Sequence, residues 1–220
     1  SLSYIWGRDG LPFITENVFI PVDEPGGTNI HSQLSFIRTH IIGADLATSL
    51  AGIGLWAEAA AFLPEHDAIM TNDLSAFYPF SPVPVVMDTV ILEKTKPYIK
   101  YIIGGDYIFA DGSYLNVQYL HGFIHERGNE ELNDYFFMRY EKSFFSDKLK
   151  IAPVGGAFIV TDWSNIGDNY AIAYIPQIAY KATDDAEISC SAVIFDGKGS
   201  NLFANMQDYN MFIFKLKYNF

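Results

Sequence analysis

Cysteine, basic side chains and long apolar runs are all scarce in this sequence of 220 residues. The single cysteine, Cys190, excludes an internal disulfide, and a lone cysteine acts more often as a small hydrophobe than as a redox centre. Lys and Arg number 14 against 26 Asp and Glu, which gives a net charge of −12. Because a phosphate-binding surface needs an excess of basic residues, this balance excludes nucleic acid as a partner.

Apolar residues are nevertheless abundant. Hydrophobic residues make up 50% of the chain and aromatic residues 16%, whereas only 18% of the residues are charged. No window holds about 18 consecutive apolar residues, so the sequence predicts no transmembrane helix. An aromatic-rich chain of this kind must distribute its apolar surface differently, and alternation along β-strands is a pattern that a hydropathy window does not detect.

The last twelve residues alternate most clearly, and they read YNMFIFKLKYNF. Successive side chains of a strand point to opposite faces. One face of this strand is therefore entirely apolar, and it carries Phe212, Phe214, Leu216, Tyr218 and Phe220. The other face carries Met211, Ile213, Lys215, Lys217 and Asn219. Soluble strands also alternate, but a chain that ends on the final aromatic residue is more unusual.

This ending resembles the C-terminal signature of bacterial outer-membrane β-barrel proteins, with a terminal Phe, a Tyr third from the end and large apolar residues before it. The resemblance covers the last twelve residues closely and the rest of the chain by architecture. It implies a transmembrane barrel in the outer membrane of a Gram-negative bacterium, in contact with outer-membrane lipid. It also implies that the barrel-assembly machinery recognises an assembly signal formed by Phe212, Phe214, Leu216, Tyr218 and Phe220.

The same period of two recurs upstream, although less regularly in places. We predict further strands at 1–7, 33–47, 52–63, 97–109, 113–123, 135–145, 148–160, 169–180 and 186–195. Lys142 falls on the apolar side of its strand, which a bulge or a lysine that reaches for the membrane interface would explain. Arg38 and His40 raise the same difficulty, and we interpret it as an uncertainty of register.

The connections between these strands alternate strictly between short and long. Short turns are predicted at 49–51, 111–112, 146–147 and 182–185, and long connections at 8–32, 64–96, 125–133, 161–168 and 196–208. Short periplasmic turns and long extracellular loops are typical of outer-membrane barrels. A β-sandwich would have no reason to follow this alternation.

The sequence therefore predicts an all-β fold: a single domain, residues 1–220, that forms an antiparallel transmembrane β-barrel of about ten strands. The first strand begins at Ser1 and is short for a membrane strand, which needs about 9–11 residues. We accordingly expect a C-terminal segment of a larger barrel, with a complete ten-stranded barrel as the alternative. The distinction matters because lumen width grows with strand number.

If the apolar faces meet lipid, the charged residues of the opposite faces line the lumen. These pore-lining candidates are Asp45, Glu58, Lys100, Asp106, Arg139, Glu141, Glu187, Lys215 and Lys217. Charges of both signs suit a water-filled pathway, whereas cross-strand pairing inside a narrow barrel is the alternative interpretation. We expect the longest connection, 64–96, to form a constriction or lid in the lumen; a cap or a contact with a partner subunit is the alternative.

No cofactor or metal site is predicted, because the loop carboxylates lack calcium-ligand spacing and the five histidines lack a spacing such as HExxH. A barrel enzyme would need a base such as His121 or His125, with Ser143 or Ser164 as distant nucleophile candidates, and the GxSxG motif is absent.

The function that the sequence favours is passive, porin-like passage of small solutes, without covalent chemistry. A homo-oligomer is compatible with it. A structural or adhesive surface barrel that acts through its loops, a barrel enzyme, and a soluble β-sandwich are the alternatives.

Overall fold

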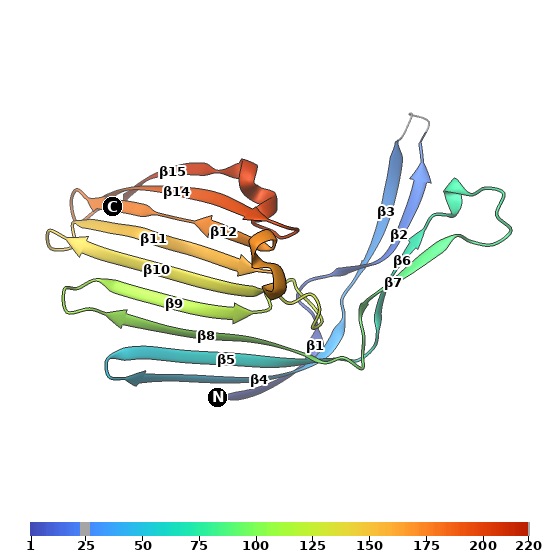
Figure 1. Ribbon diagram of the computed structural model, residues 1–220, viewed down its shortest axis with the longest axis horizontal. Coiled ribbons are helices and arrows are strands. Elements are labelled where there is room, and N and C mark those ends of the chain that lie inside the picture. Colours follow the sequence, from blue (N-terminus) through green and yellow to red (C-terminus); the bar gives the residue numbers. More distant parts are fainter. Residues whose placement is uncertain (23–26, 220) are drawn as a thin grey trace.

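Two β-sheets make up the fold in the computed structural model, which describes residues 1–22 and 27–219 (Figure 1). The larger sheet runs in the order β1-β4-β5-β8-β9-β10-β11-β12-β14-β13, and β15 pairs with β14. Its strands are β1 (Leu2–Arg8), β4 (Arg38–Leu50), β5 (Ile53–Pro64), β8 (Tyr98–Ile108), β9 (Tyr114–His121), β10 (Asp134–Phe144), β11 (Leu149–Val160), β12 (Tyr170–Tyr174), β13 (Gln177–Lys181), β14 (Ala186–Lys198) and β15 (Met211–Tyr218).

The all-β antiparallel fold predicted from the sequence is confirmed for this sheet. Each of the ten predicted stretches overlaps one of its strands, with β12 and β13 as two halves of one interrupted strand. The interruption falls at Ile175 and Pro176, where proline supplies no backbone N–H to a ladder. The predicted stretch 33–47 is divided, because its first residues belong to β3 and β4 begins only at Arg38.

The predicted short turns join neighbouring strands at one end of the sheet (Figure 1). At Ala51 and Gly52 both φ angles are positive (52° and 81°), the backbone that a tight two-residue hairpin requires. Gly112 supplies a φ of 77° in the predicted Asp111-Gly112 turn. We call this end of the sheet the turn end and the opposite end the loop end.

A second sheet lies beyond the loop end, and the sequence analysis did not predict it. It has four strands in the order β3-β2-β6-β7, with β2 (Phe13–Pro21), β3 (Thr28–Ser35), β6 (Ala68–Asp73) and β7 (Val86–Leu92). Two hairpins, each from one of the two longest predicted connections, are joined by a parallel pairing of β2 with β6. We call this sheet the arm, and it projects away from the larger sheet (Figure 1).

The expectation of a constriction formed by 64–96 is therefore wrong. This segment contributes β6, β7 and the short 3₁₀ helix η1 (Ser75–Phe77) to the arm, which extends away from the larger sheet (Figure 1). The apolar run within it does not fold into the sheet. Phe80 at its tip is 97% exposed.

A small hydrophobic cluster joins the arm to the larger sheet. Ile37, Ala68, Leu92 and Tyr98 are buried there, and Phe13 packs against them. Arg127 connects the loop 122–133 to the segment that leads into β2. Its Nε donates to Asp9 Oδ2 at 2.7 Å, and its terminal nitrogen donates to the Leu11 carbonyl at 2.6 Å.

The larger sheet is open at both edges. Among the described residues, β1 pairs only with β4 and β15 only with β14. No helix in the described part of the chain is long and apolar enough to cross a membrane.

Candidate functional site

The strand pairings sort the side chains of the larger sheet into two faces. Residues directly opposite each other in antiparallel strands point to the same side, and neighbours along a strand point to opposite sides. Following the partners from β1 to β15 therefore gives one apolar face and one polar face across the whole sheet.

The apolar face is broad and exposed. Each strand that contributes to it has large hydrophobic side chains at least a third open to solvent, among them Leu2, Tyr4, Trp6, Ile42, Leu46, Leu55, Ile99, Ile103, Val117, Met138, Val154, Ile172, Ile178, Ile188, Phe212, Phe214, Leu216 and Tyr218. Monomeric soluble proteins rarely expose a contiguous apolar patch larger than a few hundred Å². A face of this extent requires an apolar environment or a partner.

Polar groups on the apolar face lie at its two ends. At the loop end, the His40 ring nitrogen lies 2.7 Å from the Tyr4 hydroxyl, and Arg38 lies over the Trp6 ring at 5.6 Å. The carboxylate of Glu65, just beyond β5, accepts from the Trp6 indole at 2.5 Å, and this bond lowers the pKa of Glu65. The register difficulty at Arg38 and His40 is thus resolved: both belong to this face, at its rim.

Lys142 occupies the same kind of position at the turn end. The pairing of β10 places it on the apolar face, as the alternation predicted, but its ammonium reaches Asp111 Oδ2 in the neighbouring turn at 2.7 Å. This bond and those from Ser113 hold the pKa of Asp111 well below its usual range. The bulge lies on the partner strand β11 near Pro153, not on β10.

A second rim cluster at the loop end centres on Asp134, which is 8% exposed. Its carboxylate accepts from the Tyr119 hydroxyl at 2.6 Å and from the Trp163 indole, and it lies 2.7 Å from His121 Nδ1. A His–Asp pair is one half of a hydrolytic site, which also needs a nucleophile within hydrogen-bond reach.

No serine completes this pair among the described residues. Ser164 donates its hydroxyl to Asp162 at 2.6 Å, Ser143 lies on the opposite face, and His125 packs edge-on against Phe123. The structure does not bring these sequence candidates together.

All nine pore-lining candidates lie on the polar face. In the register, Asp45 lies opposite Glu58, and Glu187 lies opposite Lys217. Asp106 on β8 and Arg139 on β10 lie at the same level, with β9 between them. Lys100, Glu141 and Lys215 share the face by alternation. The face prediction therefore agrees with the register, while the role of these residues is a separate question.

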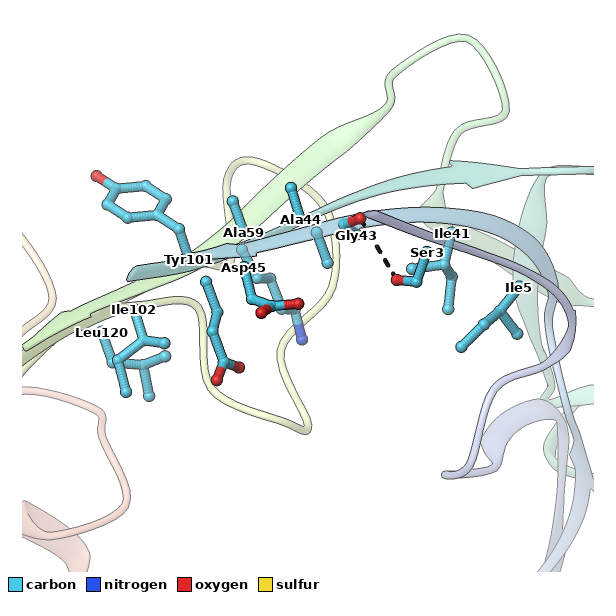
Figure 2. A pocket seen from close by; sticks show the side chains of 13 residues that line it. Ser3, Ile5, Ile41, Gly43, Ala44, Asp45, Ala59, Tyr101, Ile102 and Leu120 are labelled. Carbon is cyan, nitrogen blue, oxygen red and sulfur yellow. Dashed lines mark hydrogen bonds between the residues drawn. The ribbon is translucent and has the colours of Figure 1, made fainter. Parts of the chain in front are cut away.

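Carboxylates dominate the polar face over β4, β5 and β8. Asp45 and Glu58 stand directly opposite each other, and the N-terminal amino group lies 3.2 Å from Asp45. They border a hollow of about 400 Å³ that Ile102 and Leu120 also line. Figure 2 shows Asp45, Ile102 and Leu120 on one side of the sheet and Tyr101 on the other.

Lys100 uses its charge locally. Its ammonium donates to the Phe123 carbonyl at 2.6 Å and lies 5.5 Å from the centre of the Phe62 ring and 5.9 Å from that of Tyr98. Lys100 therefore anchors the loop 122–133 to the sheet.

A ladder of polar groups, three neutral side chains and one carboxylate, crosses the middle of the polar face. Asp106 accepts from the Tyr114 hydroxyl at 3.1 Å, the Asn116 amide donates to Tyr114 at 3.4 Å, and Gln118 donates to Asn116 at 2.8 Å. Gly104 allows a close approach beside this ladder, because a Cβ there would lie 2.5 Å from the Trp56 ring. Glycine inside a strand commonly marks such a close approach.

Cations predominate on the polar face over β10 to β15. Arg139 pairs with Glu141 at 2.8 Å and donates to Gln177 at 3.1 Å, and Lys150 also pairs with Glu141, at 3.0 Å. Lys181 lies opposite Glu187. The pore-lining candidates of the sequence analysis did not include Lys150 and Lys181, which also lie on this face.

Two loops, neither of them predicted as a cover, close over the loop end of the polar face. Phe123 from 122–133 and Phe203, next to the 3₁₀ helix η3 (Ala204–Tyr209), pack on the cluster of Tyr135, Ile159 and Ala171. These loops therefore take the covering position that was expected of 64–96. A third 3₁₀ helix, η2 (Trp163–Asp168), lies at the rim.

A buried carboxylate organises the first of these loops. Glu126 is 5% exposed, and its oxygens accept from the backbone N–H groups of Phe123 (2.7 Å) and Asn133 (3.0 Å). They also accept from the Asn133 side chain (2.6 Å) and the Tyr135 hydroxyl (2.5 Å).

The predicted assembly signal lies on the apolar face of an edge strand. Phe212, Phe214, Leu216 and Tyr218 are all exposed in β15, between 62% and 72%. Phe220 lies outside the described residues.

Comparisons with protein-family models, with curated proteins and with solved structures find no match for this chain. Among the described residues, no group of three or more His, Cys, Asp or Glu side chains is arranged to hold a metal ion.

Proposed function

We propose that this chain spans the outer membrane of a Gram-negative bacterium as the wall of a β-barrel and that small solutes pass along its polar face. The apolar face contacts lipid, and the polar face encloses a water-filled interior. The protein carries out no covalent step in this proposal. The barrel-assembly machinery inserts it, and a homo-oligomer is compatible with the exposed surfaces.

The observation that carries this proposal is the division of the whole larger sheet into one exposed apolar face and one charged face. In hydrocarbon every backbone group needs a partner, which strands satisfy only by pairing side by side. A lipid-facing band of apolar side chains with polar groups at both ends is what such a strand array needs. The rim positions of His40, Asp134 and Lys142 fit this requirement.

Unpaired charges on the polar face support a water-filled passage rather than an interior filled by side chains. Glu58, Lys215 and Lys217 have no hydrogen-bond or ion-pair partner among the described side chains, and all three are exposed. If the charges served only to pair with one another, these groups would be neutralised. Free charges of both signs suit an aqueous pathway.

A second candidate function, adhesion or recognition at the cell surface, rests on the arm. Under the proposed orientation the arm lies on the outer side, and its tip exposes Tyr78, Phe80 and Val83. A barrel that acts only through this surface would not conduct ions.

Conductance in planar lipid bilayers tests the proposal, using the protein reconstituted from detergent. We expect steady ohmic current steps from wild type. Ala179→Trp adds a bulky side chain on the polar face and should lower the step size, whereas Ile178→Trp adds it on the apolar face and should leave the step size unchanged. Absence of steps from folded protein would contradict passage, and equal effects of the two variants would contradict the assignment of the faces.

A further inference from the structure

The most basic region of the polar face lies at the turn end of β10 to β15. It contains five cations, which we call the basic cluster: Arg139, Lys150, Lys181, Lys215 and Lys217. Two carboxylates, Glu141 and Glu187, lie among them. A local excess of positive charge in a chain with a net charge of −12 is not a consequence of overall composition.

The register arranges the basic cluster in two rows. In the row nearer the turns, Glu187 stands between Lys181 and Lys217. In the next row, Lys150 and Lys215 flank Ala179 and Ser189. Because neighbouring strands lie about 4.8 Å apart, the backbones of Lys181 and Lys217 are separated by roughly 10 Å, a distance that two flexible lysines can bridge around one small molecule.

Three of these cations have no internal partner. The side chains of Lys181, Lys215 and Lys217 are exposed and make no hydrogen bond or ion pair among the described residues, although Glu187 is adjacent to two of them in the register. Several cations elsewhere in the chain pair with carboxylates, among them Lys96, Arg127, Lys142 and Lys198. The basic cluster therefore keeps charge available for a ligand.

Neutral donors surround these ammonium groups. Ser191 lies opposite Gln177 one row further from the turns, and Ser189 lies between Lys215 and Ala179. Ammonium groups with hydroxyl and amide donors beside them match the oxygens of carboxylates and phosphates.

We propose that the basic cluster binds a small anion with two or more negative charges, of the di- or tricarboxylate or phosphate class. The proposal names the solute class for the pathway proposed above, and it rests on that function only for transport, since binding to the cluster does not require a pore. Citrate and inorganic phosphate are the two probes, and they distinguish the carboxylate source from the phosphate source.

Calorimetric titration of the detergent-solubilised protein with each probe at low salt measures binding. The test variant is the triple substitution Lys181→Gln, Lys215→Gln and Lys217→Gln. The control triple, Arg8→Gln, Lys94→Gln and Lys198→Gln, removes the same charge from exposed positions outside the polar face. Removing three charges that surround one anion should weaken binding by roughly tenfold or more, and added salt should reduce the difference.

Binding of either probe by wild type and the control, with loss in the test variant, supports the proposal. Absence of binding by wild type, or equal binding by all three proteins, overturns it. Bilayer currents separate this outcome from the fate of the proposed function: steady current steps from a protein that binds neither probe overturn the anion site alone. Anion binding by a folded protein that never conducts overturns the passage alone.

Discussion

At the scale of single residues, buried and rim carboxylates do most of the organising. Glu126 accepts from three donors of its loop and from the Tyr135 hydroxyl of β10, Asp134 contacts three polar groups at the rim, and Asp111 pairs with a lysine on the neighbouring hairpin. Each carboxylate joins a loop or turn to a strand, so removing its charge should lower the stability of the fold.

Glu126→Gln should destabilise the protein by about 2 kcal/mol, because the amide can accept only part of the four hydrogen bonds and presents its own N–H groups to the Asn133 and Tyr135 donors. Urea unfolding in detergent measures the change. Glu131→Gln, an exposed position in the same loop, is the control and should stay within about 0.5 kcal/mol of wild type. Equal stability of the two variants would contradict the role assigned to Glu126.

The ion pair of Asp111 with Lys142 should make the stability of the fold depend on pH. The bond from Lys142 and those from Ser113 lower the pKa of its carboxyl in the folded protein. The pair therefore stabilises the fold at pH values above the unfolded pKa of about 3.9, and this contribution is lost as the pH falls toward the folded pKa.

Wild type and Asp111→Asn should accordingly differ most in unfolding free energy at neutral pH and converge in strongly acidic solution. Unfolding curves of both proteins across this range measure the effect. A difference that grew as the pH fell would refute the ion pair as its source.

At the scale of elements, the strands of the larger sheet were predictable because period-two alternation is strong over them. The arm was not. Its strand β3 reads TNIHSQLS, with polar residues on both faces, and the pairing of β2 with β6 joins residues 55 positions apart, such as Glu16 and Thr71. No local pattern encodes such a pairing.

The assignment of charged residues to the two faces was also only partly predictable from the sequence. Alternation alone placed nine charged residues on the correct face, but it failed for Lys150, because the bulge near Pro153 shifts the parity between the two halves of β11. Lys181 was missed because the predicted strand ended one residue earlier. The loop cover by Phe123 and Phe203 depends on tertiary packing, which no spacing in the sequence encodes.

The joint of the arm gives a prediction at this scale. Arg127→Gln leaves Asp9 without its cation and the Leu11 carbonyl without its donor, both only partly exposed. Limited proteolysis should then cleave the chain near the joint about tenfold faster than in wild type. Arg8→Gln, which removes an exposed cation from the adjacent strand, should leave the cleavage rate unchanged; equal acceleration in both would contradict the anchoring role.

At the scale of the whole molecule, one sheet carries two environments on its two sides, and an arm extends beyond its loop end (Figure 1). The open edges at β1 and β15 present unpaired backbone groups, which a membrane does not tolerate. In the proposed membrane setting both edges must therefore be paired. The proposed anion site, the rim clusters and the solute pathway all follow from the same assignment of faces.

The native cysteine allows the most direct measurement of that assignment. Cys190 lies on the apolar face opposite Phe214, and Ser191, the next residue, lies on the polar face. An environment-sensitive fluorophore on Cys190, in protein reconstituted into vesicles, should be quenched by brominated lipid and protected from aqueous iodide. The same label on Ser191→Cys in a Cys190→Ala background should show the reverse. Quenching of the Cys190 label by iodide but not by brominated lipid would contradict the central claim that the apolar face contacts hydrocarbon.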